Sequence, residues 1–529
     1  MAKRAINHLD INTYNIGWKV MKNLKKLTPI LALTTIITAP GVLAHSDHEN
    51  ASNTFVTPTL ETGIREGDDV YFDLSLQSGF SQILPDVLTE TWGINQPFLG
   101  TTLKARKGDS VHVTVSNNLD TTTTLHWHGV KLPARADGGP HQPIEPEEEW
   151  LSEFDIIQPA ATLWYHAHQL HETGAQVYKG LAGMFIIEDD NSQSLGLPSE
   201  YGVDDFPVII QDREFNEDGS MVYLGRFDVQ GGMMGKTGDT ILVNGVINPL
   251  LTVEKSLIRL RILNGSNARI YNLQFDDNRS FKIIGSDGGL LEQSVEAAMI
   301  TIAPAERIEI VVDLSDGGTP TLIHSAGMAG MTGMDASDMG FFETVAMSIF
   351  ADDEPEQGFN IFQIYGSHAA ASRAIVPDQL STHNDYSGEI IAARRTMTLK
   401  MEDGSPFTTI TAGIFGSNDL LTINDQSMDI GRIDAFVKKG TVEIWSIVNA
   451  SMMAHPFHIH NVQFKIISRN GEVKSHELGF KDVVLVQPGE TVEVLMKFPE
   501  FSDPNTPYMF HCHILEHEDR GMMGQFVVI

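Results

Sequence analysis

The stretch Met509-Phe510-His511-Cys512-His513 decides the fold, because an earlier stretch of the chain matches it. Trp164-Tyr165-His166-Ala167-His168 also places an aromatic residue directly before a His-x-His pair. Each stretch is followed by a short apolar run that begins with glycine, at residues 183–187 and 524–528. Equivalent segments of this kind indicate that the chain contains an internal repeat.

Three copies of the repeat can be followed outward from this stretch. Each copy contains a hydrophobic residue followed by asparagine, and then a strand-like run that itself ends in asparagine. The first and third copies continue into histidine clusters, whereas the second continues into residues 267–269, which contain no histidine. We therefore predict three homologous domains, of which the middle one lacks metal ligands. The paired asparagines are Asn95 and Asn117, Asn244 and Asn264, and Asn424 and Asn449.

The sequence pattern beyond the N-terminal segment is typical of β-structure. Alternating runs such as residues 111–115 are separated by Gly, Pro, Asn and Asp, and long amphipathic helical patterns are scarce. This pattern predicts an all-β chain of sandwiches or barrels. We place the domains at residues 55–190, 200–350 and 394–529, with an acidic, irregular linker at residues 351–393.

Composition limits the partners and the compartment. The chain has 529 residues, 36 basic and 69 acidic, and its net charge of −33 disfavours binding to nucleic acid and to anionic membranes. The single cysteine excludes an intrachain disulfide. Residues 1–44 are typical of a signal peptide, with lysines before an apolar run at residues 27–38 that is too short to remain in a bilayer. Met21 would begin a better-proportioned signal, and either start predicts a periplasmic or secreted protein.

Ten of the 20 histidines fall in four short clusters. On a strand, residues i and i+2 point to one face, so each His-x-His pair directs two imidazoles into the same space. Pairs from the first and third copies can therefore close around one site between two domains. One such pair is a weak indication of a metal site, but four pairs at equivalent points of a repeat are a strong one. The clusters are His126 and His128; His166 and His168; His455, His458 and His460; and His511, His513 and His517.

The fourth cluster indicates which metal is bound. A Cys thiolate, two imidazoles and a weak thioether ligand suit copper that transfers electrons. Cys512, His517 and Met522 lie within one short segment, and His455 can supply the second imidazole. Zinc prefers a closed tetrahedral site and has no use for a thioether. Met523 is the neighbour of Met522, and one of the two can equally be a core residue.

The sequence His511-Cys512-His513 also predicts a link between two metal centres. In an extended strand Cys512 points to one side and both flanking imidazoles point to the other. The thiolate would then hold one copper while the imidazoles contact a different copper group. Because adjacent Cα atoms lie about 3.8 Å apart, electrons would have few bonds to cross.

These motifs resemble those of the multicopper oxidases, the family of laccases, bilirubin oxidases and bacterial cuprous oxidases, over residues 55–529. The resemblance implies three tandem cupredoxin-like Greek-key domains, about four coppers per chain, dioxygen as electron acceptor, a small reducing substrate and a monomeric chain. By motif position it implies the type 1 ligands His455, Cys512, His517 and Met522, the type 2 ligands His126 and His458, and the type 3 ligands His128, His166, His168, His460, His511 and His513.

The same resemblance implies further site residues. Asp137 and Glu518 match acids that help to move protons to bound oxygen in the bacterial branch of the family. The alternatives are a turn-forming role for Asp137 and a solvated charge for Glu518. Met401 aligns with a substrate-copper methionine of the bacterial cuprous oxidases, and Met453 lies close in sequence to a type 1 ligand.

Two classes of electron donor compete. Cu(I) is favoured by Met401, by Met453 and by four methionines in the Gly-rich residues 328–339, because thioethers are soft ligands. Phenols are favoured by two departures from the cuprous oxidases: a long Met- and His-rich insertion is missing, and Ser451 replaces an aspartate. The stretch at residues 328–339 can also serve as adaptable packing or as a surface that binds organic molecules.

Three other functions are weaker alternatives. A passive copper-buffering protein needs metal sites but not the linking sequence around Cys512. A copper nitrite reductase normally has two such domains per chain and no type 3 pair. A division-associated periplasmic relative keeps the fold but has lost the copper ligands, which are intact in this sequence.

Overall fold

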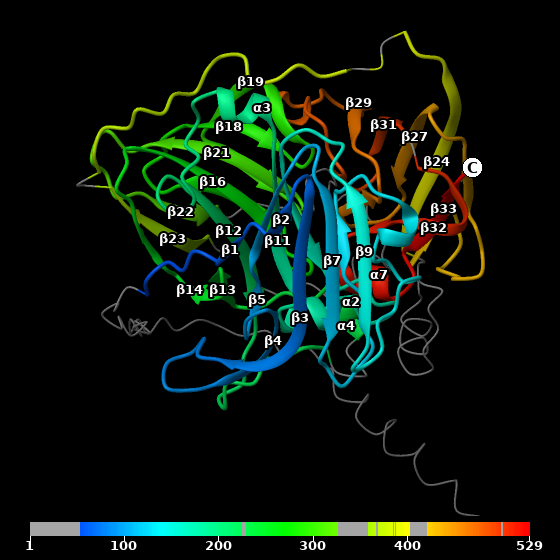
Figure 1. Ribbon diagram of the computed structural model, residues 1–529, viewed down its shortest axis with the longest axis horizontal. Coiled ribbons are helices and arrows are strands. Elements are labelled where there is room, and N and C mark those ends of the chain that lie inside the picture. Colours follow the sequence, from blue (N-terminus) through cyan, green and yellow to red (C-terminus); the bar gives the residue numbers. More distant parts are fainter. Residues whose placement is uncertain are drawn as a thin grey trace, which may run out of the picture. The chain divides into compact units, whose positions relative to one another are not determined.

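The computed structural model describes residues 53–224, 229–325, 358–366, 369–384, 386, 388–401, 421–498 and 501–529. The expected signal peptide in residues 1–44 and the Met-Gly stretch in residues 328–339 lie outside this part of the chain. Strands dominate the described residues and form six sheets, so the all-β prediction is confirmed (Figure 1). The helices are short: α2 (Thr173–Lys179), α3 (Asp190–Ser194), α4 (Val229–Met234), α7 (Leu515–Asp519), and the 3-10 helices η1 (Ala134–Ala136) and η2 (Ser475–Glu477).

The first copy of the repeat forms two sheets, and in Figure 1 the strands β3, β7 and β9 of one of them lie side by side. This sheet contains, in spatial order, β5 (Leu99–Gly100), β4 (Thr89–Ile94), β3 (Asp69–Ser81), β7 (Ser110–Asn117) and β9 (Glu149–Asp155), with β2 (Ile64–Glu66) beside β3. The other sheet contains β1 (Leu60–Glu61), β6 (Thr102–Arg106), β11 (Ala182–Glu188), β10 (Ala161–His166) and β8 (His126–His128).

The second copy also forms two sheets. The larger contains β14 (Val246–Ile247), β13 (Thr240–Val243), β12 (Asp205–Arg213), β16 (Leu257–Asn264), β21 (Arg307–Asp313), β18 (Phe281–Ser286) and β19 (Gly289–Ala297). The smaller contains β15 (Leu250–Thr252), β23 (Phe359–Tyr365), β22 (Thr321–His324), β17 (Tyr271–Phe275) and β20 (Met299–Ile302).

The third copy forms the last two sheets. One contains β25 (Leu421–Ile423), β24 (Ile391–Met401), β27 (Val442–Asn449), β31 (Thr491–Lys497) and β29 (Phe464–Arg469). The other contains β26 (Ala435–Val437), β33 (Met523–Val528), β32 (Asp503–Cys512), β28 (His455–Ile459) and β30 (Val483–Val486).

The repeated asparagines make equivalent contacts in all three copies. Asn95, Asn244 and Asn424 have positive φ values of 61°, 50° and 55°, a conformation that asparagine tolerates better than most residues. The side-chain oxygen of each accepts a backbone N–H from a neighbouring strand. The side-chain nitrogens of the second set each donate to two backbone carbonyls, and these residues are Asn117, Asn264 and Asn449.

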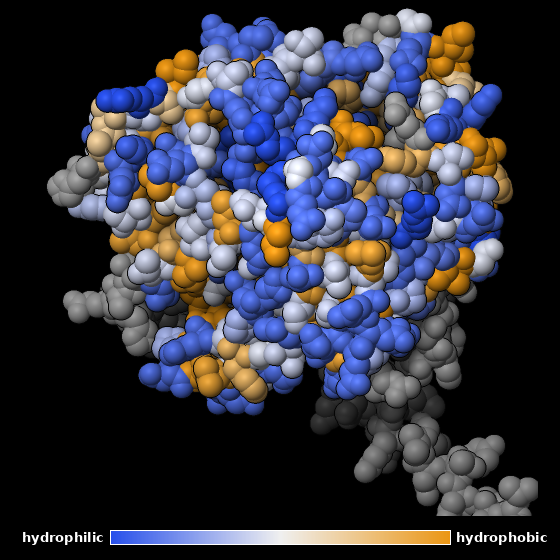
Figure 2. Space-filling model, viewed as in Figure 1, coloured by the Kyte–Doolittle hydropathy of each residue, from blue (hydrophilic) through white to orange (hydrophobic). Residues whose placement is uncertain are grey.

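Strand β7 shows why these segments form sheets. Its side chains alternate between half-buried and buried, and Val111, Val113 and Val115 point into the core. Burial of one such valine contributes about 1.5 kcal/mol or more. Each copy of the repeat has a hydrophobic cluster of its own. Figure 2 shows a mainly hydrophilic face with scattered apolar side chains.

The structure differs from the predicted boundaries at two places. The prediction that residues 351–393 form an irregular linker is wrong for residues 359–365. They form strand β23, which pairs with β15 and β22. Ile361, Phe362 and Ile364 of this strand are buried in the core of the middle copy, and the acidic residues that precede it conceal this pattern in the sequence. Phe55, expected to open the first domain, packs in the same middle core.

Candidate metal centre

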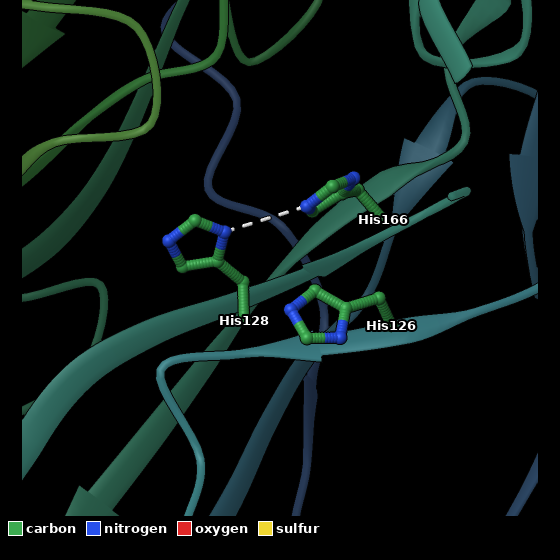
Figure 3. Close-up of side chains that lie close together, drawn as sticks. All are labelled: His126, His128 and His166. Carbon is green, nitrogen blue, oxygen red and sulfur yellow. Dashed lines mark hydrogen bonds between the residues drawn. The ribbon is translucent and has the colours of Figure 1, made fainter. Parts of the chain in front are cut away.

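Strand β8 supplies the first pair of imidazoles. His126 and His128 point to one face of β8, while Trp127 between them is buried against Phe154 and Tyr165. Strand β10 pairs with β8 in antiparallel register and brings His166 opposite His126. Figure 3 shows these three histidines together, with His128 Nδ1 lying 3.4 Å from His166 Nε2.

The third copy supplies the facing imidazoles. Strands β28 and β32 pair so that His458 lies opposite His511 and Phe457 lies opposite Cys512. His168 Nε2 lies 3.2 Å from His460 Nε2 and 3.3 Å from His511 Nε2. All eight predicted histidines of the types 2 and 3 are buried, and the structure brings the pairs from the first and third copies together as expected.

In each imidazole we call the ring nitrogen that faces away from the other histidines the outer nitrogen, and the one that faces them the inner nitrogen. Most of these imidazoles are hydrogen-bonded through the outer nitrogen, so the inner nitrogen remains available to a metal. Nδ1 of His126, His166 and His458 donates to a backbone carbonyl 2.7–2.8 Å away. Within the described residues, Nε2 of His126 and Nε2 of His458 have no hydrogen-bond partner, nor has either ring nitrogen of His513. Orphaned nitrogens that converge in a buried space are the pattern expected where imidazoles hold a metal.

Burial also keeps these imidazoles neutral. Burial, together with the neighbouring His168, lowers the pKa of His166 to about 3, and burial lowers that of His168 to about 4. The pKa values of His126, His458 and His460 are also well below the usual range, again chiefly because of burial. A neutral imidazole keeps the lone pair that a metal requires, so the donor set fits copper.

Cys512 lies at a second group of donors on the other side of β32. Its Sγ is 3.4 Å from His455 Nδ1 and 3.6 Å from His517 Nδ1. The outer nitrogen of His455 lies 2.7 Å from Ser451 Oγ, and His517 Nε2 donates to the Met233 carbonyl oxygen at 2.8 Å. Burial raises the pKa of the thiol, so the thiolate requires a cation such as copper to form.

The predicted methionine ligand lies beside this group. Met522 is fully buried in the same hydrophobic cluster as Cys512, and its carbonyl oxygen accepts the Cys512 N–H at 3.0 Å. Met523 instead begins β33, where it lies opposite His511. The structure therefore favours Met522 over its neighbour.

Both predicted carboxylates are buried next to the histidines. Asp137 Oδ2 lies 2.8 Å from His460 Nδ1, and burial raises the pKa of Asp137 well above its usual range. Glu518 is 1% exposed, so it is not a solvated charge. Its oxygens lie 3.3 Å from His168 Nδ1 and 3.1 Å from His511 Nδ1.

The predicted substrate methionines are less well placed by the structure. Met401 ends β24, and Met453 lies in the turn before β28. Both are half-buried against the core of the third copy.

Sequence reasoning missed Asp482, whose Oδ1 lies 3.1 Å from His128 Nε2. It also missed Arg307, which binds Asp482, and Met233, which binds His517. Nothing in the local sequence distinguishes these residues, because a buried ion pair between distant segments leaves no periodic pattern.

Comparison with known proteins agrees with this arrangement. Two models of the multicopper oxidase family match residues 77–192 and 395–529. The multicopper oxidase mco of Staphylococcus haemolyticus is 38% identical over 86% of this chain and 88% of its own length. The cell division protein FtsP of Photorhabdus laumondii is 34% identical over 96% of this chain and 98% of its own length.

The solved structures give the same result. The crystal structure of a laccase from Pediococcus acidilactici has a TM-score of 0.77 and 35% identity, and the match covers 91% of this chain and 94% of that one. This likeness, with the paired sheets described above, confirms the predicted cupredoxin-like fold.

Proposed function

The chain belongs to the multicopper oxidase family and is an oxidoreductase, and we propose that it couples the one-electron oxidation of a small reducing substrate to the four-electron reduction of dioxygen to water. The observation that carries this proposal is the position of Cys512 between His511 and His513. The thiol faces His455 and His517, while the two flanking imidazoles belong to the histidine group built from both outer copies.

Copper, once bound, would supply the reversible one-electron chemistry that the side chains lack. We propose about four coppers per chain, held by the donors that the sequence predicted. The mononuclear type 1 group is His455, Cys512, His517 and Met522. The second group comprises the type 2 ligands His126 and His458 and the type 3 ligands His128, His166, His168, His460, His511 and His513.

Glu518 and Asp137 are the residues that would hold and move protons. Reduction of dioxygen to water consumes protons, so a buried site needs carboxyl groups that can supply them. Glu518 lies beside the outer nitrogens of two histidines, and Asp137 lies beside a third. Burial raises the pKa of the Asp137 carboxyl well above its usual range, so burial favours its protonated form.

For the electron donor, the burial of His517 favours Cu(I) over a phenol. His517 is 0% exposed and its outer nitrogen is already bonded to Met233, so a bulky ring has no free imidazole edge to contact. A small soft ion that is passed along thioethers such as Met453 and Met401 does not need that contact. A laccase-like activity is the second candidate, because the Pediococcus acidilactici relative is a laccase.

One experiment separates these functions. The protein is loaded with copper, and its visible spectrum and its oxygen uptake are measured with Cu(I) and then with a phenol as donor. We expect an intense blue colour and oxygen uptake with at least one donor, faster with Cu(I). Colour without oxygen uptake would refute the oxidase and leave a buffering or division-associated role, and uptake of nitrite instead of oxygen would indicate a nitrite reductase.

We also propose that the protein acts in the periplasm or outside the cell, as a monomer. The support for export is the signal-like sequence of residues 1–44, and the support for a monomer is the net charge of −33, which opposes self-association. In the described part of the chain, no helix has both the length and the hydropathy needed to cross a bilayer. N-terminal sequencing of the exported protein would test the cleavage site, and retention of residues 1–44 would contradict it.

A further inference from the structure

Asp482 fixes the orientation of two histidines in the centre. It immediately precedes β30 and is fully buried. Its carboxylate accepts the Nε2–H of His128 at 3.1 Å, and its backbone oxygen accepts the Nδ1–H of His458 at 2.7 Å. His128 therefore turns Nδ1 inward, toward His166, whereas His458 turns Nε2 inward. This one residue thus selects a different inner nitrogen for each of its two neighbours.

Arg307, in the middle copy, holds Asp482 in place. Arg307 begins β21, and its guanidinium forms two bonds to the carboxylate, Nη1 to Oδ1 at 2.7 Å and Nη2 to Oδ2 at 2.5 Å. Paired bonds of this kind fix the plane of a carboxylate, which a lysine ammonium cannot do.

The remaining N–H groups of Arg307 are also bonded. Nε donates to the Thr162 carbonyl at 3.2 Å, Nη1 to the Ala305 carbonyl at 2.9 Å and Nη2 to the Asp287 carbonyl at 3.0 Å. All five guanidinium protons therefore have acceptors, and these acceptors come from all three copies of the repeat. A fully buried side chain with every donor satisfied has no freedom to move.

We propose that Arg307 is a positioning residue of the metal centre: through Asp482 it sets which nitrogen of His128 faces the metal. This inference rests on the proposed function. It gives the middle copy, which has no predicted metal ligands, an indirect part in metal binding. Partners of this kind, which orient a ligand without touching the metal, typically change metal affinity about 10–100-fold when they are replaced.

The test compares copper retention in Arg307→Lys and Arg307→Met with that in Arg213→Lys. Arg213 is a matched control because it is equally buried in the middle copy, but within the described residues its hydrogen bonds go to the backbone carbonyls of Val177, Tyr178 and Asp212. Each copper-loaded protein is titrated with a copper chelator, and copper content and the blue absorbance are followed together.

We expect both Arg307 variants to lose the copper of the histidine group at about 10–100-fold lower chelator concentration, with the blue absorbance of the Cys512 group retained. Arg213→Lys should lose stability but hold copper as the unchanged chain does. Equal retention in all variants, or equal loss from both groups, would overturn the proposal.

If neither Arg307 variant folds, Asp482→Asn serves instead, because it preserves the size of the side chain and removes the charge. The same selective loss is expected, and retention equal to that of the unchanged chain would overturn the proposal. If the protein without any substitution holds copper but shows no blue colour, the proposed function is refuted. That result differs from the results that would overturn the role of Arg307, so the two proposals can fail separately.

Discussion

Mild acid should destabilise the copper-free protein, because the imidazoles that we propose as metal ligands are buried in the neutral form. Burial lowers the pKa of His166 to about 3 and the pKa values of His168 and His517 to about 4. A histidine in an unfolded chain has a pKa of about 6.5, so below that pH the unfolded chain binds protons that the folded chain excludes. At about pH 5.5 each of these imidazoles removes between about 1 and 2 kcal/mol from the free energy of unfolding, and together they remove about 4 kcal/mol.

Other buried groups change the size of this effect but not its sign. Buried carboxyls such as those of Asp137 and Asp519 act in the opposite direction, because burial raises their pKa values and the folded chain then binds their protons first. The imidazoles outnumber these carboxyls, so the net change is a loss of stability. Six further imidazoles have pKa values lowered chiefly by burial: His126, His128, His455, His458, His460 and His513.

The assay is urea unfolding at about pH 7.5 and at about pH 5.5, with and without copper. The loss of 4 kcal/mol or more is a large share of a typical stability of about 5–15 kcal/mol, so the urea midpoint of the copper-free protein should fall clearly. Copper should raise the midpoint at both pH values, but it displaces no proton from imidazoles that are already neutral, so both forms should lose a similar free energy on acidification. No fall in the copper-free form would refute the reasoning.

Three substitutions test individual residues. Cys512→Ser should abolish both the blue colour and oxygen uptake, and colour that survived would show that another sulfur ligand produces it. Glu518→Gln should slow oxygen uptake about 100-fold with the colour unchanged, whereas the equally buried control Glu516→Gln should lower stability and leave uptake nearly normal; equal rates in both would contradict a proton role. Tyr165→Phe removes the 2.6 Å bond from Oη to the Thr101 carbonyl, and it should lower the free energy of unfolding by about 1–3 kcal/mol without loss of copper; an unchanged urea midpoint would contradict that bond.

The alternating runs were enough to predict the all-β fold, and the repeat with its His-x-His pairs was enough to predict where the histidines gather. Both signals are local, because strand alternation puts His126 and His128 on one face whatever the rest of the chain does. Repeated asparagines such as Asn117 could also be recognised in the sequence, because Asn117 bonds to a backbone carbonyl a few residues away.

The features that sequence analysis missed depend on segments that meet only in the folded chain. Strand β23 was predicted as linker because its partner β15 lies more than a hundred positions away. The bond between Arg307 and Asp482 spans 175 positions. A charged residue in a sequence is normally exposed, so its burial opposite another charge can be learned only from the structure.

The two proposed metal groups differ in how much of the chain must be folded before each exists. His455 and Cys512 are 57 positions apart, whereas His168 and His511 are 343 apart and come from opposite ends of the described chain. If each copy of the repeat folds as a unit, the donors of the cysteine group, all within residues 455–522, come together when the third copy folds. The histidine group exists only after the third copy has packed against the first. A maturing chain that is offered copper should therefore turn blue before it can consume oxygen.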